Sequence, residues 1–144
     1  MRVIDMSWDE LLERFDRAKS AFLLRDATLL VRAAGEPLLT GRFAFFLQNE
    51  FPEWDVDPEF NLDGDRRKRL ANPYDRLVRP DIIVHQRHTH RNLIVFEAKK
   101  SRVSDNADRV KLKAFKTDPR YLYAYAALLR FVTGDQPDIH IIRV

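Results

Sequence analysis

The sequence lacks cysteine entirely, with none among its 144 residues. This absence excludes disulfide bonds, thiolate catalysis and cysteine-ligated zinc, and it favours a reducing compartment, so we expect a cytoplasmic protein. Long apolar runs are also missing, since no stretch approaches the roughly 20 residues that a membrane-spanning helix needs. The N-terminal stretch MRVIDMSWDELLERF has no apolar core of a secretory signal. We therefore expect neither a membrane partner nor export.

The charges are nearly balanced overall but locally basic. Charged residues make up 33% of the chain and the net charge is +3. The densest basic groups are DRRKR (65–69), RHTHR (87–91) and KKSR (99–102). Such groups fit a polyanionic partner, although charge clusters are also common in solvated loops. With 45% apolar residues, the 144 residues should form one globular domain, 1–144.

Helical patterns dominate the N-terminal third. Ser7 and Glu10 have the spacing of a capping box, and an apolar stripe with helical period follows them. This helix, or a second short one, should end near Gly35, so that residues 1–34 form an N-terminal helical extension. Pro37 sits in the first turn of a further predicted helix.

Strand patterns dominate the remainder. The predicted strands are residues 54–62, 80–86, 92–100 and 138–144. Pro58 makes the first of them an edge strand or a bulged one. A helix should begin at a Ser104 cap and end before Pro119. Residues 120–132 fit either a strand or a helix, and the tyrosines there are interpreted as core residues rather than base-stacking ones.

The second and third strands hold charges that a buried strand normally excludes. The short polar loop between them predicts an antiparallel hairpin, and a turn centred on Thr89 places Asp81 opposite Glu97. Directly opposed residues share a face, with Cβ atoms about 4.5–5.5 Å apart. Lys99, two residues beyond Glu97, shares that face as well. The same register places His85 opposite Leu93.

Two carboxylates and an ammonium at one point favour phosphodiester chemistry. Adjacent carboxylates repel each other unless a proton or a cation lies between them, and oxygen ligands without thiolates suit Mg²⁺ or Mn²⁺. A neighbouring lysine can orient or deprotonate a water molecule. The plainer interpretation is a structural ion pair at a strand end, in which Lys99 neutralises Asp81 or Glu97.

The motif formed by Pro80-Asp81 and Glu97-Ala98-Lys99 resembles the core of the PD-(D/E)XK nuclease superfamily. The resemblance covers most of the chain beyond about residue 30. It implies an α/β, restriction endonuclease-like fold: a central mixed sheet of four to five strands flanked by helices, with an αβββαβ core and here an extra N-terminal helix.

The resemblance also implies roles for individual residues. Asp81 and Glu97 would bind the metal, the carbonyl of Ala98 would contribute to its coordination, and Lys99 would position the attacking water. Glu36, at the start of the predicted second helix, matches a further acidic position in the family. A first-turn glutamate favoured by the helix dipole explains Glu36 equally well.

Nucleic-acid contacts are expected from basic residues outside the motif. Arg66, Arg67 and Lys68 belong to a long polar loop that can grip a phosphate backbone or remain solvated. Lys111, on the helix after the motif, can approach a phosphate or simply face water, and it matches a lysine that is usual in the family. The histidines at 88 and 90 fall in the hairpin turn, far from the acidic group, so a zinc site there is not favoured.

The expected function is a divalent-metal-dependent nuclease that hydrolyses the DNA backbone, with RNA left open as a substrate. The alternative is a catalytically silent module that binds nucleic acid or a partner on the same fold. A homodimer or a partner subunit is compatible with either reading.

Overall fold

The computed structural model describes residues 4–58, 62, 63, 66, 67, 80–101 and 103–144, with the backbone alone described at 62, 63, 66 and 67. The elements in chain order are α1 (Trp8–Val31), α2 (Glu36–Glu50), β1 (Asp55–Pro58), β2 (Leu62–Asp63), β3 (Arg66–Arg67), β4 (Ile82–His85), β5 (Asn92–Lys100), α3 (Asn106–Thr117), β6 (Tyr125–Val132) and β7 (Asp138–Arg143).

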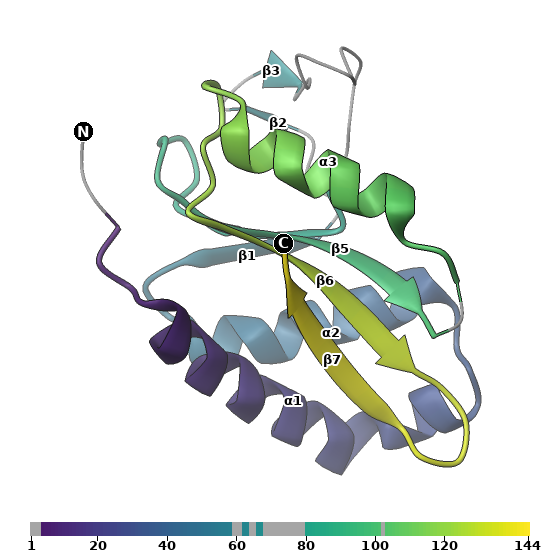
Figure 1. Cartoon of the computed structure of the whole chain (residues 1–144). Coiled ribbons are helices and arrows are strands. Elements are labelled where there is room, and N and C mark those ends of the chain that lie inside the picture. The colour runs from purple at the N-terminus through teal and green to yellow at the C-terminus, as the bar shows by residue number, and fades with distance from the viewer. Residues whose placement is uncertain (1–3, 59–61, 64–65, 68–79, 102) are drawn as a thin grey trace.

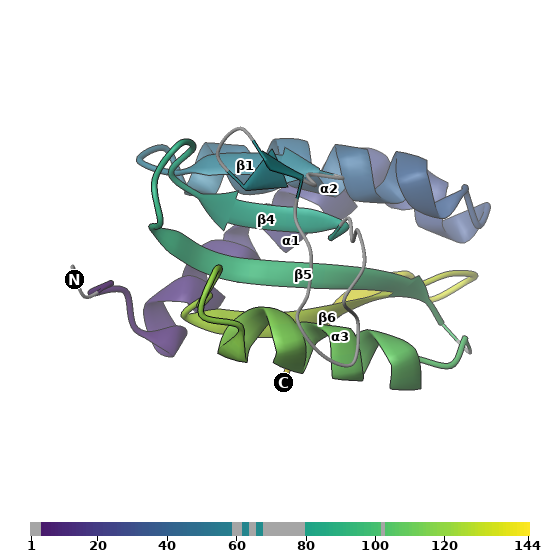
Figure 2. The same ribbon diagram turned by 90° about the horizontal axis from the view of Figure 1, so that it is seen from above.

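A five-stranded mixed sheet of order β1-β4-β5-β6-β7 forms the centre of the fold. β5 and β6 are parallel and are joined through α3, whereas the other neighbours in this sheet are antiparallel. Helices α1 and α2 cover one face of the sheet and α3 covers the other (Figures 1 and 2). The predicted α/β class and mixed sheet are confirmed, and β1, which contains Pro58, is an edge strand as expected.

The N-terminal helix is longer than the capping pattern alone suggests. The Ser7 hydroxyl accepts a hydrogen bond from the Glu10 backbone N–H at 3.1 Å, which satisfies one free donor of the first turn. The helix continues to Val31 through a kink at Asp26, where φ is −120° and ψ is 16°. Arg42 of α2 donates to the Asp26 carboxylate at 2.8 Å. This contact ties the kink of α1 to α2.

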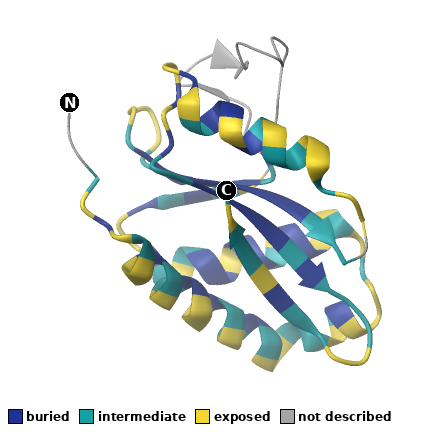
Figure 3. Ribbon diagram, viewed as in Figure 1, coloured by how far each residue is buried: buried dark blue, intermediate teal, exposed yellow. Residues whose placement is uncertain are grey.

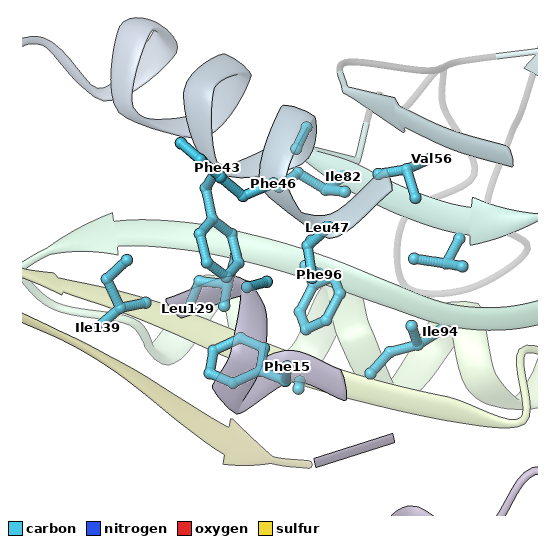
Figure 4. Packing of buried hydrophobic residues seen from close by; sticks show 14 of the residues in the cluster. Phe15, Phe43, Phe46, Leu47, Val56, Ile82, Ile94, Phe96, Leu129 and Ile139 are labelled. Atoms are coloured by element: carbon cyan, nitrogen blue, oxygen red, sulfur yellow. The ribbon is translucent and has the colours of Figure 1, made fainter. Parts of the chain in front are cut away.

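Phenylalanines pack together with aliphatic side chains in the core between the sheet and the two N-terminal helices (Figure 4). The central strands β5 and β6 are mostly buried (Figure 3). Phe43 of α2 lies edge-to-face with Phe15 of α1, with ring centroids 5.3 Å apart, and with Phe131 of β6 at 6.3 Å. Such pairs contribute about 0.5–1.5 kcal/mol each beyond the burial of their surface. This packing holds α2 against the sheet and so fixes the position of its first residue, Glu36.

The opposite face carries a smaller core under α3. Its centre includes Phe115 of α3 together with Tyr121 and Tyr123, whose side chains are buried. The interpretation of these two tyrosines as core residues is confirmed. The ambiguous segment forms strand β6 between β5 and β7, with helices over both faces, which explains why its apolar residues run on without alternation.

The hairpin register is confirmed over three pairs and wrong at the fourth. Ile82 pairs with Phe96, and the register holds as far as Val84. A bulge then shifts the pairing, so that His85 lies opposite Asn92 and not Leu93. A bulge adds one residue to one strand, which simple counting cannot include. The alignment of Asp81 with Glu97 lies on the unshifted side.

The third helix begins one residue later than predicted. Asp105, not Ser104, occupies the N-cap position, and it makes no side-chain hydrogen bond to the helix backbone. Its carboxylate instead accepts hydrogen bonds from Arg109 and from Arg130 of β6. The start of α3 is therefore held to the sheet by the ion pair between Asp105 and Arg130. Among the described helices, none combines the length and the apolar character that crossing a membrane requires.

Candidate active site

The structure brings Asp81, Glu97 and Lys99 together at the end of the β4–β5 hairpin remote from the turn. Asp81 directly precedes β4, and the Ile82–Phe96 pair leads to its alignment with Glu97. Phe96 and Ala98 pack into the core beneath α1 and α2. Because side chains alternate along a strand, Glu97 and Lys99 lie on the opposite face, under α3.

The Asp81 carboxylate is fixed by the backbone of β5. It accepts a hydrogen bond from the Ala98 N–H at 2.7 Å. The N–H and C=O groups of one strand residue point toward the same neighbouring strand. The Ala98 carbonyl is therefore directed to the Asp81 side of β5 as well. The Asp81 carboxylate and the Ala98 carbonyl, both predicted as metal ligands, therefore lie on the same side of β5.

Glu97 is the most buried charged group of the site, with its side chain 3% exposed. Burial raises its pKa well above the usual range, and the nearby Asp81 carboxylate raises it further, against the opposing effect of Lys111. The Lys111 ammonium lies 2.8 Å from Oε1. This contact has ion-pair distance without hydrogen-bond geometry, so Oε1 has no hydrogen-bond donor among the described residues.

Lys99 carries a firmly held proton. Burial by itself would lower its pKa, but the negative charges of Asp108, Glu36 and Asp81 outweigh that effect and raise it. Its Nζ lies 3.5 Å from Oδ2 of Asp108 on α3. An ammonium in this state donates hydrogen bonds and accepts no proton. The ammonium can donate a hydrogen bond to a water molecule, as the predicted orienting role requires, and the deprotonating role stays a prediction.

Glu36 reaches the same cluster from the other helical layer. It is the first residue of α2, and its carboxylate accepts a hydrogen bond from the backbone N–H of Lys100, at the end of β5. Burial raises its pKa, and Asp81 adds to the rise. Glu50, at the far end of α2, instead pairs with Arg17 at 2.8 Å. The structure thus places Glu36 near the cluster and Glu50 away from it.

Asp108 is a member of the cluster that the sequence reasoning missed. It lies in the first turn of α3, three residues before Lys111, so the two side chains share a helix face. Lys111 was singled out from the sequence, and the residues three and four positions away from it on the helix were the signal that could have indicated Asp108. What the sequence does not show is that α3 crosses directly above Glu97 and Lys99.

The other predicted residues lie elsewhere or outside the described parts. The backbone of Arg66 and Arg67 forms β3, which pairs with β2 on the α3 side of the sheet (Figure 1). Their side chains, and Lys68 altogether, fall outside the described residues. His88 lies in the hairpin turn at the end opposite Asp81.

His85 is part of a second charged group, near that turn. Its Nε2 lies 2.6 Å from Oδ2 of Asp57 on β1, and Arg87 also donates to both oxygens of Asp57. Burial by itself would raise the pKa of Asp57, but the hydrogen bonds from Arg87 and His85 prevail and hold it far below the usual range. His85 is thus paired with Asp57 and remote from the cluster.

The donor set around Asp81 fits a hard divalent cation in part. Two carboxylates lie close enough for one to raise the pKa of the other, and one buried oxygen lacks a hydrogen-bond donor. Such oxygens suit Mg²⁺ or Mn²⁺. Over the described residues, however, no three acidic or histidine side chains stand as a preformed metal cage. No protein-family model, curated protein sequence or solved structure matches the chain.

Proposed function

We propose that the protein is a divalent-metal-dependent nuclease that hydrolyses the backbone of DNA. The observation that carries the proposal is the buried Glu97 beside Asp81, with a raised pKa and an oxygen that lacks a hydrogen-bond donor. Two close carboxylates destabilise each other unless a proton or cation lies between them. Perturbed carboxylates of this kind concentrate at functional sites.

The order of elements supports a restriction endonuclease-like fold. From α2 onward, the elements of the main sheet and its helices run α2, β1, β4, β5, α3, β6, which is the αβββαβ order that the resemblance implies. Helix α1 precedes this core and β7 follows it. Asp81 directly precedes β4 and Glu97 lies near the end of β5, which supports the comparison with the motif.

The metal would be held by Asp81 and Glu97, with the Ala98 carbonyl directed to the same place and Glu36 close by. When bound, a divalent ion polarises a phosphoryl oxygen and offsets the negative charge that develops during hydrolysis. Asp81 is held in place by the Ala98 N–H, so it needs no rearrangement to act as a ligand. Preorganisation of this kind is what a catalytic site requires.

Lys99 would position the nucleophilic water. Its ammonium is held by Asp108 and has a raised pKa, so it can donate a hydrogen bond to a water oxygen and keep a lone pair aimed at phosphorus. The proton released by the water would pass to solvent or to the phosphate itself.

The test is a cleavage assay with millimolar Mg²⁺ or Mn²⁺ on double-stranded DNA, single-stranded DNA and RNA. We expect cleavage by the wild type and a loss on the order of 100-fold in Lys99→Ala, since it removes a group that positions the nucleophile. Lys113→Ala is the matched control, because Lys113 is an exposed lysine on α3. Equal cleavage by the wild type and Lys99→Ala would show that the assigned mechanism is wrong.

A binding module without catalysis is the second candidate, and one observation favours it. Both members of the Glu-X-Lys motif already have internal ion partners, Lys111 and Asp108. Calorimetry with Mn²⁺ separates the candidates. Binding that disappears in Asp81→Asn supports the nuclease, whereas DNA binding without any metal binding at millimolar concentration supports the module.

A further inference from the structure

Two ion pairs link β5 to α3 above the candidate metal ligands. Glu97 of β5 pairs with Lys111 of α3 at 2.8 Å, and Lys99 of β5 pairs with Asp108 of α3 at 3.5 Å. The acid lies on the strand in the first pair and on the helix in the second. Residues two apart on a strand and three apart on a helix are separated by about 7 Å and 5 Å, so the pairs stand side by side.

The pair between Glu97 and Lys111 joins a buried oxygen to a partly exposed ammonium. The glutamate side chain is 3% exposed, whereas that of Lys111 is 23% exposed. Among the described residues, Glu97 is the acidic partner recorded for Lys111, and no hydrogen-bond donor reaches Oε1. The ammonium is thus the cation that offsets the buried charge in the metal-free protein.

A divalent cation needs the same oxygen. Mg²⁺ and Mn²⁺ contact carboxylate oxygens at about 2.1 Å, and the ammonium lies 2.8 Å from Oε1. Two cations this close to one oxygen repel each other strongly at the low effective dielectric of a buried site. The lysine side chain has the length and the exposure to swing away from α3 toward solvent. The carboxylate, which belongs to the central strand, does not.

We propose that Lys111 is the resident counter-ion of this site: its ammonium holds Glu97 in the metal-free protein, and a divalent cation binds by displacing it. The proposal rests on the metal site of the proposed function. In this proposal Lys111 pairs with Glu97 before the metal binds and is released when it binds, whereas a simple phosphate contact would not involve Glu97. Once displaced, the ammonium stays beside the cluster without a carboxylate partner, where a phosphate oxygen is the ligand that its chemistry favours.

The experiment is calorimetric titration of Mn²⁺ into metal-free protein at pH 8. Lys111→Gln removes the competing charge and keeps most of the side-chain length, so we expect its Kd for Mn²⁺ to fall roughly tenfold below that of the wild type. Lys111→Arg keeps the charge and should stay closer to the wild type than Lys111→Gln does. Lys113→Gln removes an exposed positive charge from the same helix and should change the Kd less than twofold, because solvent screens it.

The thermal stabilisation by Mn²⁺ provides a second reading that does not depend on activity. The rise in Tm on adding Mn²⁺ should be larger for Lys111→Gln than for the wild type, since the metal then replaces a missing counter-ion. If Lys111→Gln does not fold without metal, Lys111→Met is measured for the same change.

The outcomes separate this inference from the proposed function. If the wild type binds Mn²⁺ and Lys111→Gln binds it equally or more weakly, the exchange is wrong and the metal site stands. If neither binds at millimolar concentration, both are wrong. If Lys111→Gln binds Mn²⁺ more tightly than the wild type, and Lys111→Arg and Lys113→Gln do not, both the metal site and the exchange are supported.

Discussion

Two carboxylates near opposite ends of the β4–β5 hairpin, the largely buried Asp57 of the neighbouring strand β1 and the buried Glu97 of β5, behave in opposite ways. Asp57 lies opposite Ile83, which belongs to the core under α3, so its side chain lies on the same face of the sheet as Glu97. Both carboxylates have basic neighbours. The pKa of Asp57 is nevertheless lowered and that of Glu97 is raised.

The difference lies in how completely each charge is compensated. Asp57 receives hydrogen bonds from His85 and from two nitrogens of Arg87, with no second carboxylate among the causes of its shift. Glu97 has a single ammonium contact, a neighbouring carboxylate and an oxygen without a hydrogen-bond donor. A fully compensated buried charge holds structure together, whereas a partly compensated one lowers stability and is typical of a functional site.

The largest expected effect is at the compensated end. Asp57→Asn removes the charge that His85 and Arg87 share, and it should lower the free energy of unfolding by about 3 kcal/mol, the scale for breaking a largely buried ion pair. Urea denaturation measures it. Asp55→Asn is the control, because Asp55 is more exposed than Asp57, and we expect a loss of less than about 1 kcal/mol there. Equal losses in the two variants would contradict the comparison.

The same change of acid to amide should have the opposite sign at the other end. Glu97→Gln removes the buried charge and its repulsion with Asp81, and it should raise the free energy of unfolding by about 1 kcal/mol at pH 8 in the presence of a chelator. Urea denaturation alongside Asp57→Asn gives the direct contrast. A loss of stability in Glu97→Gln would mean that the Lys111 pair outweighs the cost of burial.

The pH dependence of these two differences should also diverge. A carboxyl group whose pKa is raised on folding stabilises the protein below its unfolded pKa and loses that contribution as pH rises through the folded pKa. The advantage of Glu97→Gln over the wild type should therefore grow by about 1 kcal/mol between pH 5 and pH 8. The lowered pKa of Asp57 gives a contribution that is lost only in strong acid, so the loss in Asp57→Asn should stay constant over that range. Denaturation at several pH values reads both trends.

The smallest expected effect tests the geometry of the compensated end. Arg87→Lys keeps the positive charge and loses the two-pronged contact with Asp57. Because the Arg87 side chain is 49% exposed, we expect a loss of only about 0.5 kcal/mol. Denaturation curves that coincide with the wild type would show that charge alone, without the fork geometry, sustains Asp57.

Sequence reasoning predicted the site where local rules were sufficient. The period of two along a strand and a single turn position placed Asp81, Glu97 and Lys99 on one face, and the register over the first three pairs follows that count. The His85 pairing failed because a bulge depends on how the whole sheet twists. The partnership of Asp57 with His85 could not be predicted, since it joins β1 to β4 across an edge of the sheet.

The contribution of α3 was visible only in the structure. Which helical residues meet which strand residues depends on the angle and height at which α3 crosses β5. The core contacts of Phe115 with Tyr121 and Tyr123 hold the helix there. Packing of this kind comes from side-chain shape over many residues. For that reason Asp108 was missed although it lies three residues before Lys111, and Lys111 itself was found only through the family resemblance.

The turn between β4 and β5 also offers a practical means of observing the site. It lies at the end of the hairpin away from Asp81, and His90 there is exposed. The chain contains no cysteine, so His90→Cys would introduce its only thiol. A fluorophore or spin label attached to that thiol would be fixed to the β4–β5 hairpin, which carries the candidate ligands. It would report the binding of metal or nucleic acid from a position remote from the candidate ligands.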